Sequence, residues 1–172
     1  MIPKEDTRAS VPKIARYLSD METRELLAHM KKRKLAPNEE LLTLGVANDE
    51  VYYVERGELL VSLPLPERTL HLGSRPAGSW VGEITFLETG PATATVQAAR
   101  ETVVIGLSRD SFMELGAKQP DVAARFLRAV SEDLVRRIRN AGVVLEAPMT
   151  TETRPSLWSQ MVVKLFSARS PS

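Results

Sequence analysis

The residues whose types and spacing best suit binding chemistry lie in one short segment, residues 80–96. Gly82 and Gly90 bracket a stretch that is too short for an ordinary helix, and an acid, Glu83, directly follows the first glycine. A glycine lets the backbone approach a ligand closely, and the N–H groups that begin a helix suit a phosphate. A carboxylate such as that of Glu83 accepts hydrogen bonds from vicinal sugar hydroxyls. The segment therefore predicts a site for a sugar phosphate, with a glycine-bounded turn of a β-sandwich as the structural alternative.

Small residues occupy the second half of this segment. Ala92, Thr93 and Ala94 follow Pro91 and leave room for a ligand the size of a nucleotide. The Thr93 hydroxyl can donate a hydrogen bond to a phosphate or to a base edge. Both halves of the segment are thus compatible with one nucleotide.

Catalysis and metal binding find little support in the sequence. The chain has no cysteine, and its two histidines, His29 and His71, have no partner at the spacing of a metal site or an acid–base pair. Neither a Gly-x-Ser-x-Gly elbow nor a Walker loop occurs. We therefore expect no enzyme, no catalytic residue and no bound metal.

Charge and hydropathy indicate which partners and which cellular compartment to expect. Its net charge of +1 creates no overall field that would recruit nucleic acid or an anionic membrane. The N-terminus has no apolar run behind a basic start, and no later segment approaches eighteen uninterrupted apolar residues. We expect a soluble, cytoplasmic protein.

Residues 1–34 are expected to form an N-terminal helical segment that precedes the β-structure. Ser19 and Glu22 have the spacing of a capping box and an apolar period of helical type follows, so we expect a helix over residues 10–34. The basic run 31–34 would lie in its last turn, as a solvated helix end, where cations complement the helix dipole.

Residues 35–107 carry the signals of short strands separated by turns. Runs of apolar and β-branched residues alternate with Pro and Gly at eight-to-twelve-residue spacing, which favours a sandwich or barrel. Residues 51–55 and 59–63 flank Arg56 and Gly57, so we expect a hairpin there.

Helical signals return over residues 108–141. Ser108 is a candidate N-cap, Gly116 a possible stop and Pro120 the start of a second, longer helix. The apolar residues of that helix form a stripe, Ala123, Leu127, Val130, Leu134 and Ile138, which Val122, Phe126 and Val135 widen beyond what one contact requires.

Residues 142–172 complete the chain as a linker and a short amphipathic helix. Gly142, Pro148 and Pro155 predict a linker over 142–156. The apolar side chains of residues 156–168 would lie on one side of a helix. A helix this short must bury its apolar face to be stable, either against its own domain or against a partner protein. Burial in a membrane surface is the less favoured alternative.

Segment 80–96 resembles the phosphate-binding cassette of the cyclic nucleotide-binding domain family. The family's pattern is Gly-Glu, an apolar stretch with a small residue, then Pro-Arg, a small residue, Ala and Thr. Segments 41–45 and 51–59 resemble two earlier blocks of the family, and the resemblance covers about residues 12–140. It implies an α+β fold, in which an antiparallel, jelly-roll-like β-roll of about eight strands carries N-terminal helices, a short cassette helix and two C-terminal helices that serve as hinge and lid.

The same resemblance implies a ligand and the residues that bind it. Glu83 would bind the ribose 2′-hydroxyl of a cyclic nucleotide such as cAMP or cGMP, and the backbone near Gly82 and Ile84 would bind phosphate oxygens. The full set of candidate ligand-binding residues is Gly82, Glu83, Ile84, Thr85, Ala92, Thr93 and Ala94.

One position departs from the family's pattern. The Arg that pairs with the cyclic phosphate is replaced by Ala92. A charge-assisted contact of this kind is worth about 2–4 kcal/mol, so its loss weakens binding roughly 30- to 1,000-fold.

Three explanations of this departure stay open. Another cation can replace the lost one, and the candidates are Arg75, Arg100, Arg136, Arg137 and Arg139. The ligand can instead be a different one, such as a cyclic dinucleotide or a neutral molecule. The pocket can also be degenerate, in a domain that works through protein contacts.

The expected function is regulation by binding, without catalysis. A cyclic nucleotide, sensed now or formerly, would signal through the lid helix. The alternative is a ligand-independent dimerisation or protein-interaction module, with a homodimer or protein partner bound through residues 121–141 and 156–168. Nucleic acid is not an expected partner, because the 32 residues after position 140 are too few for a winged helix.

Overall fold

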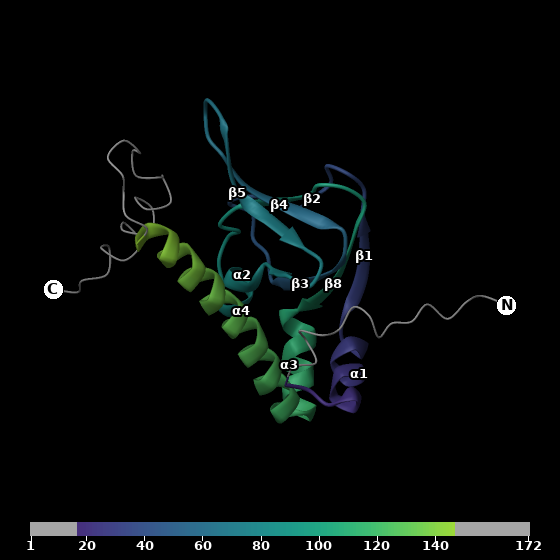
Figure 1. Cartoon of the computed structure of the whole chain (residues 1–172). Coiled ribbons are helices and arrows are strands. Elements are labelled where there is room, and N and C mark those ends of the chain that lie inside the picture. The colour runs from purple at the N-terminus through teal and green to yellow at the C-terminus, as the bar shows by residue number, and fades with distance from the viewer. Residues whose placement is uncertain (1–16, 147–172) are drawn as a thin grey trace. The chain divides into compact units, whose positions relative to one another are not determined.

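The computed structural model describes residues 17–146 of the 172-residue chain, with side chains through residue 140 (Figure 1). It divides into two units at Leu134, and the β-structure lies wholly in the first. The predicted helix at 156–168 and the linker beyond residue 146 lie outside the described residues. The elements, in chain order, are α1 (Asp20–Ala28), β1 (Lys31–Leu35), β2 (Glu40–Leu42), β3 (Glu50–Arg56), β4 (Glu58–Pro64), β5 (Thr69–Pro76), β6 (Trp80–Val81), α2 (Glu83–Leu87), β7 (Thr95–Ala98), β8 (Thr102–Ser108), α3 (Arg109–Lys118) and α4 (Pro120–Glu146).

Within residues 17–146, eight strands form two antiparallel sheets of four, which confirms the predicted α+β fold with a β-roll. One sheet has the order β1-β8-β3-β6 and the other β2-β7-β4-β5. Alternate residues of β3 belong to two different cores, as the strand period of two requires. Val51 and Tyr53 pack with α1, α3 and α4, whereas Tyr52 and Val54 pack in a second cluster drawn from both sheets. We call that second cluster the roll core; its buried members are Leu35, Leu41, Leu42, Tyr52, Val54, Leu59, Val61, Val81, Ala92, Ala94, Val96, Ala98 and Val104.

The basic run 31–34 forms most of strand β1, so its prediction as the last turn of a helix is wrong. The capping box of Ser19 and Glu22 is confirmed, but α1 ends at Ala28, and His29 caps it with backbone bonds to Leu26 and Leu27. The basic residues instead pair antiparallel with β8 at the edge of the first sheet. Pairing with a partner strand overrides the local helical signal, and lysines on an edge strand discourage pairing with another chain.

The predicted hairpin across Gly57 is also wrong, because the two strands belong to different sheets. β3 pairs with β6 and β8, whereas β4 pairs with β5 and β7. Gly57 has φ +94, and a Cβ there would lie 2.7 Å from the Glu101 carbonyl oxygen. The glycine therefore permits a crossover between sheets where the chain passes close to the start of β8.

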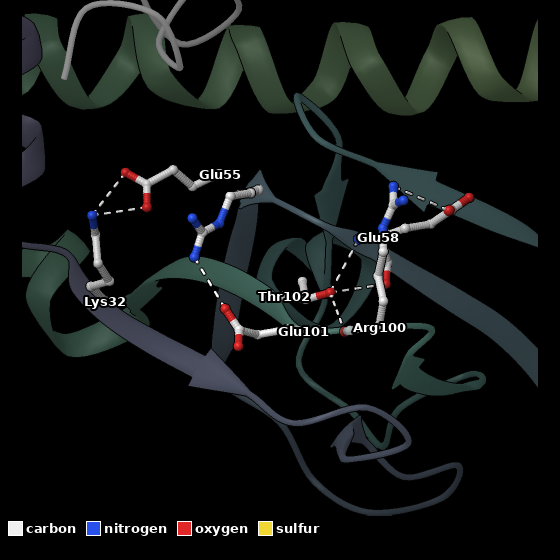
Figure 2. Close-up of polar contacts among 7 residues, drawn as sticks. Lys32, Glu55, Glu58, Arg100, Glu101 and Thr102 are labelled. Atoms are coloured by element: carbon white, nitrogen blue, oxygen red, sulfur yellow. Dashed lines mark hydrogen bonds and ion pairs between the residues drawn. The ribbon is translucent and has the colours of Figure 1, made fainter. Parts of the chain in front are cut away.

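Thr102 holds this crossover in place. Its side chain is fully buried, and its Oγ1 accepts the Glu58 N–H (3.1 Å) and donates to the Arg100 carbonyl oxygen (2.8 Å). Figure 2 shows this hydroxyl between the crossover and the turn that precedes β8, with ion pairs around it. One buried hydroxyl thus joins two segments that lie more than 40 residues apart.

The helices after the roll begin where the sequence predicts and end elsewhere. Ser108 caps α3 and Pro120 begins α4, which confirms both predicted starts. Gly116 does not stop α3, which continues to Lys118. The helix ends at Gln119 because a proline, here Pro120, disfavours the helical conformation of the residue before it. Nor does Gly142 begin a linker. One glycine costs a helix only about 1 kcal/mol, and α4 continues to Glu146.

Candidate functional site

The segment 80–96, which we call the cassette, has the local structure that its glycines predict. After β6 the chain turns at Gly82, whose φ is +79, and the short helix α2 begins at Glu83. A Cβ at Gly82 would lie 2.6 Å from the Glu50 carbonyl oxygen. Only glycine fits this turn, because both the left-handed backbone and the close approach to β3 exclude a side chain.

Two of the predicted residues on α2 are buried and one is exposed. Glu83 is only 4% exposed, and Thr85 is buried too, whereas Ile84 is 42% exposed. The Thr85 hydroxyl donates to the Gly82 carbonyl oxygen (3.1 Å). Thus Glu83 lies inside the domain, directly behind the turn that the sequence singled out.

Asn48 fixes α2 from outside the cassette, and the sequence analysis did not identify it. Its Nδ2 donates to the Thr85 hydroxyl (2.8 Å) and to the Glu50 carbonyl oxygen (2.6 Å). Nearby, burial and the adjacent Glu50 carboxylate raise the pKa of Tyr52. The only sequence signal for Asn48 is a short polar residue just before a strand.

The small residues 92–94 lie just before β7, where backbone hydrogen bonds join Ala92 to the loop that contains Gly45. The Gly45 N–H donates to the Ala92 carbonyl oxygen and the Ala92 N–H to that of Val46, each at 2.8 Å. Ala92, 4% exposed, and Ala94 belong to the roll core, whereas Thr93 is exposed. The structure therefore turns two of the three predicted small residues toward the interior.

The candidate cations take different places. Arg100 lies in the turn after β7 and pairs with Glu58 at 3.5 Å (Figure 2). Arg75 lies in β5, directly opposite Leu59, and is half-buried. Its Nη1 donates to the Ser74 carbonyl oxygen at 2.9 Å. Arg136, Arg137 and Arg139 belong to the second unit.

Aromatic rings connect α2 to α3 and α4. The Phe86 ring lies 5.4 Å from that of Phe112 in α3 and 6.2 Å from that of Phe126 in α4, both in edge-on geometry. Phe126 also meets Trp80, with ring centroids 5.5 Å apart. Phe126, predicted only to widen the apolar stripe of α4, is one of its central core residues.

Arg109 makes a second connection of this kind, which the sequence analysis also missed. It is the first residue of α3; its Nη2 donates to the Thr85 carbonyl oxygen (2.8 Å), and its guanidinium lies 5.7 Å from the centre of the Phe86 ring. A movement of α2 would therefore act on α3 through a polar contact and on both helices through packed rings.

Within residues 17–146, no group of three or more His, Asp and Glu side chains could hold a metal ion. No helix in that range has the length and hydropathy needed to cross a membrane.

The fold and the cassette together define the class of the protein. The model of the cyclic nucleotide-binding domain family matches residues 32–119, about half of the chain. The chain belongs to this family, which confirms the resemblance drawn from its sequence.

Individual relatives agree with this assignment. A cyclic nucleotide-binding domain from Methylobacillus flagellatus has a TM-score of 0.75 at 21% identity, covering 85% of this chain and 86% of that one. The N-terminal domain of a transcriptional regulator from Streptomyces coelicolor has a TM-score of 0.65 at 26% identity, covering 86% of this chain and all of that one. A cyclic nucleotide-gated potassium channel from Rhizobium etli is 24% identical over 108 residues, 63% of this chain. The match spans only 29% of the channel's length.

Proposed function

We propose that this chain is a non-catalytic regulatory domain that binds a cyclic nucleotide, cAMP or cGMP, inside its β-roll. One observation carries the proposal: Glu83, buried behind the left-handed turn at Gly82, begins a helix whose Phe86 packs against both α3 and α4. Glu83 would accept the ribose hydroxyl, and backbone N–H groups near Gly82 and Ile84 would face the phosphate. Ala92 and Ala94 would leave space for the ligand.

The signal would pass from α2 to the helices that follow the roll. A ligand that binds one position of α2 better than another shifts the population of that position. Because Phe86 and Arg109 connect α2 with α3 and α4, a shift of α2 requires their rearrangement. The lid helix α4 is thus the output of the domain in this proposal.

The replacement of the phosphate-binding Arg by Ala92 sets the expected affinity. Without that contact, a site that would otherwise be micromolar moves toward millimolar. Weak binding suits a ligand whose cellular concentration is high, or a domain whose second binding partner supplies the remaining free energy.

A second candidate function is a ligand-independent module that acts through protein contacts. The observation in its favour is that Ala92 is buried in the roll core, so the position of the lost Arg is part of an apolar interior. The exposed Val135 and Ile138 of α4 would then meet a second copy of the chain or another protein. Residues 121–141 and 156–168 are the segments proposed for that contact.

Calorimetry of the full chain separates the two functions. The natural protein and Glu83→Gln are titrated with cAMP, cGMP and cyclic di-GMP up to millimolar concentration, with Glu88→Gln as a matched control from an exposed carboxylate at the end of α2. The regulatory proposal predicts binding of a cyclic mononucleotide by the natural protein and by Glu88→Gln, and binding weakened at least tenfold by Glu83→Gln. Absence of heat with every nucleotide would favour the protein-interaction module.

A further inference from the structure

Strand β1 leaves one edge of the first sheet open. Among the described residues the sheet has the order β1-β8-β3-β6, so β1 has a neighbouring strand on one side only (Figure 1). The first four residues of β1, 31–34, are all basic and all exposed, whereas Leu35 at its end is buried. An open strand edge presents backbone N–H and C=O groups that can pair with another strand. The charges on this edge therefore indicate which kind of strand fits it.

The hydrogen-bond pattern between β3 and β8 shows which residues of β8 bond to β1. The Arg109 N–H donates to the Asp49 carbonyl oxygen (3.0 Å), just beyond the last residue pair of these two strands, so that pair is not itself hydrogen-bonded. Hydrogen-bonded and non-hydrogen-bonded pairs alternate along an antiparallel ladder. Gly106 and Val104 therefore direct their backbone groups toward β1. In agreement, the N–H of Val54, which lies opposite Val104, donates to a residue outside β8.

The register of β1 assigns its outward backbone groups to Lys32 and Lys34. Lys31 and Arg33 lie opposite Gly106 and Val104, so their N–H and C=O groups belong to the ladder with β8. Those of Lys32 and Lys34 point away from the sheet. Within residues 17–146, no backbone hydrogen bond outside the ladder involves either of these two lysines. Each of them thus offers one donor and one acceptor to an added strand.

The four cations of β1 divide between the two faces of the sheet. Lys32 lies opposite Ile105, which packs against the core beneath the helices, and Lys34 shares that face. Lys31 and Arg33 lie on the other face, that of the roll core. A flat polyanion would meet the cations of one face only. A strand added in the plane of the sheet would place side chains beside the cations of both faces.

Two of these cations already have acidic partners. Lys32 pairs with Glu55 (2.8 Å; Figure 2), and Arg33 pairs with Glu39 (2.9 Å). In the part of the chain that the structure describes, the other two lysines of the strand have no ion pair. Each face thus keeps one unpaired cation. This is little for a nucleic acid or an anionic membrane, since electrostatic binding to such a partner grows with the number of cations engaged.

We propose that the β1 edge binds an acidic segment of a partner protein, which adds to the first sheet as a fifth strand. The backbone of that segment pairs with the outward groups of Lys32 and Lys34, and its carboxylates meet Lys31 and Lys34 across the strands. Because the latter two lysines are three positions apart and lie on opposite faces, the segment carries acids at positions i and i+3. A second copy of β1 does not fit, since it would place cations opposite cations.

A synthetic peptide tests the charge pattern and the backbone pairing. It has six residues, with glutamates at its second and fifth positions and threonine or valine elsewhere, and is titrated into the full chain while backbone amide resonances are followed by NMR. We expect saturable shifts at Lys32 and Lys34 and an affinity that falls as salt is added. The same peptide with lysines in place of its glutamates is expected not to bind.

Two N-methylated peptides test the addition as a strand without any change in the protein. One carries N-methyl groups at its odd positions and the other at its even positions. Only alternate N–H groups of an added strand point toward β1. We therefore expect one of the two peptides to lose binding and the other to keep it.

A double variant tests the role of the unpaired lysines. Lys31→Gln together with Lys34→Gln should weaken binding of the glutamate peptide roughly two- to thirtyfold, because both cross-strand ion pairs are lost. Arg24→Gln together with Arg68→Gln is the matched control: it removes two exposed cations from outside the edge and should leave the affinity unchanged. The N-methylated peptides still test the proposal if the first double variant fails to fold.

The contrary outcomes are specific to this edge. Absence of saturable binding of the glutamate peptide, equal binding of both N-methylated peptides, or an equal affinity of the two double variants would overturn the proposal. So would a twelve-nucleotide single-stranded DNA, or vesicles that contain phosphatidylserine, that bind the natural chain more tightly than the peptide does. None of these measurements requires a nucleotide in the roll, so they leave the proposed function to its own test.

Discussion

At the scale of single residues, the proposed site rests on a turn that only glycine fits. It also includes Ala92, at the position where the resemblance to the family implies an arginine. The type and spacing of Gly82 and Glu83 predict a turn that opens a short helix, and the structure has both. The burial of Glu83 was not predicted. Asn48 and Arg109 were not predicted. Their contacts with Thr85 join positions 24 or more residues apart, and no local pattern marks such pairs.

Ala92→Arg tests whether the site has lost only its charge partner. We expect this variant to bind cyclic nucleotides roughly 30- to 1,000-fold more tightly than the natural protein, because the new guanidinium pairs with the phosphate. Without ligand it should be less stable, since it places a charge in the roll core. Calorimetry and thermal unfolding with and without nucleotide measure both effects. Equal affinity of variant and natural protein would show that the pocket has changed beyond this one residue.

Thr102→Val tests the polar contact at the sheet crossover. Valine has nearly the same shape but cannot satisfy the Glu58 N–H or the Arg100 carbonyl oxygen, so the free energy of unfolding should fall by about 1–3 kcal/mol. Denaturant unfolding measures the change. Thr69→Val, at an exposed position of β5, should stay within about 0.5 kcal/mol of the natural protein. A similar small effect at Thr102 would contradict the role given to its hydroxyl.

At the scale of elements, the prediction of helices and strands is correct where local signals are strong. It is wrong where pairing with a distant strand decides the structure of a segment. The starts of α3 and α4 follow from Ser108 and Pro120, whose effects on the backbone are local. The basic run 31–34 looks like a helix end, yet it becomes a strand because β8 is available to pair with it. The crossover at Gly57 has the local sequence of a hairpin turn, yet β3 and β4 do not pair with each other. Which sheet each strand joins depends on partner strands far along the chain.

The basic residues of β1 are expected to protect an open sheet edge. Lys32 and Lys34 are exposed on the edge strand of the first sheet. Replacing both by valine should make the protein aggregate at concentrations where the natural protein is monodisperse, because an apolar edge pairs with other chains. Light scattering during a concentration series measures this. The control is Lys118→Val together with Arg128→Val, which removes two charges from helix surfaces; aggregation of the control alone would contradict the edge mechanism.

At the scale of the whole molecule, the proposed nucleotide site and the first parts of the helices proposed as hinge and lid share one core. Phe86 contacts both α3 and α4, so the cassette is built into the same core that holds the helices to the first sheet. The family and the fold could be predicted from the sequence because the cassette and the strand blocks are contiguous. The inner face of the roll could not be predicted, because Arg75, Leu59 and Ala98 come together only through strand register.

The central claim, that a cyclic nucleotide binds within the roll of the natural protein, is tested most directly by NMR. Backbone amide resonances of the full chain are followed while cGMP is added to millimolar concentration, which detects weak binding residue by residue. The account predicts saturable shifts at Gly82, Glu83 and residues 92–94, with smaller shifts along α3. Unchanged resonances at these positions, or shifts confined to surfaces outside the cassette, would contradict it.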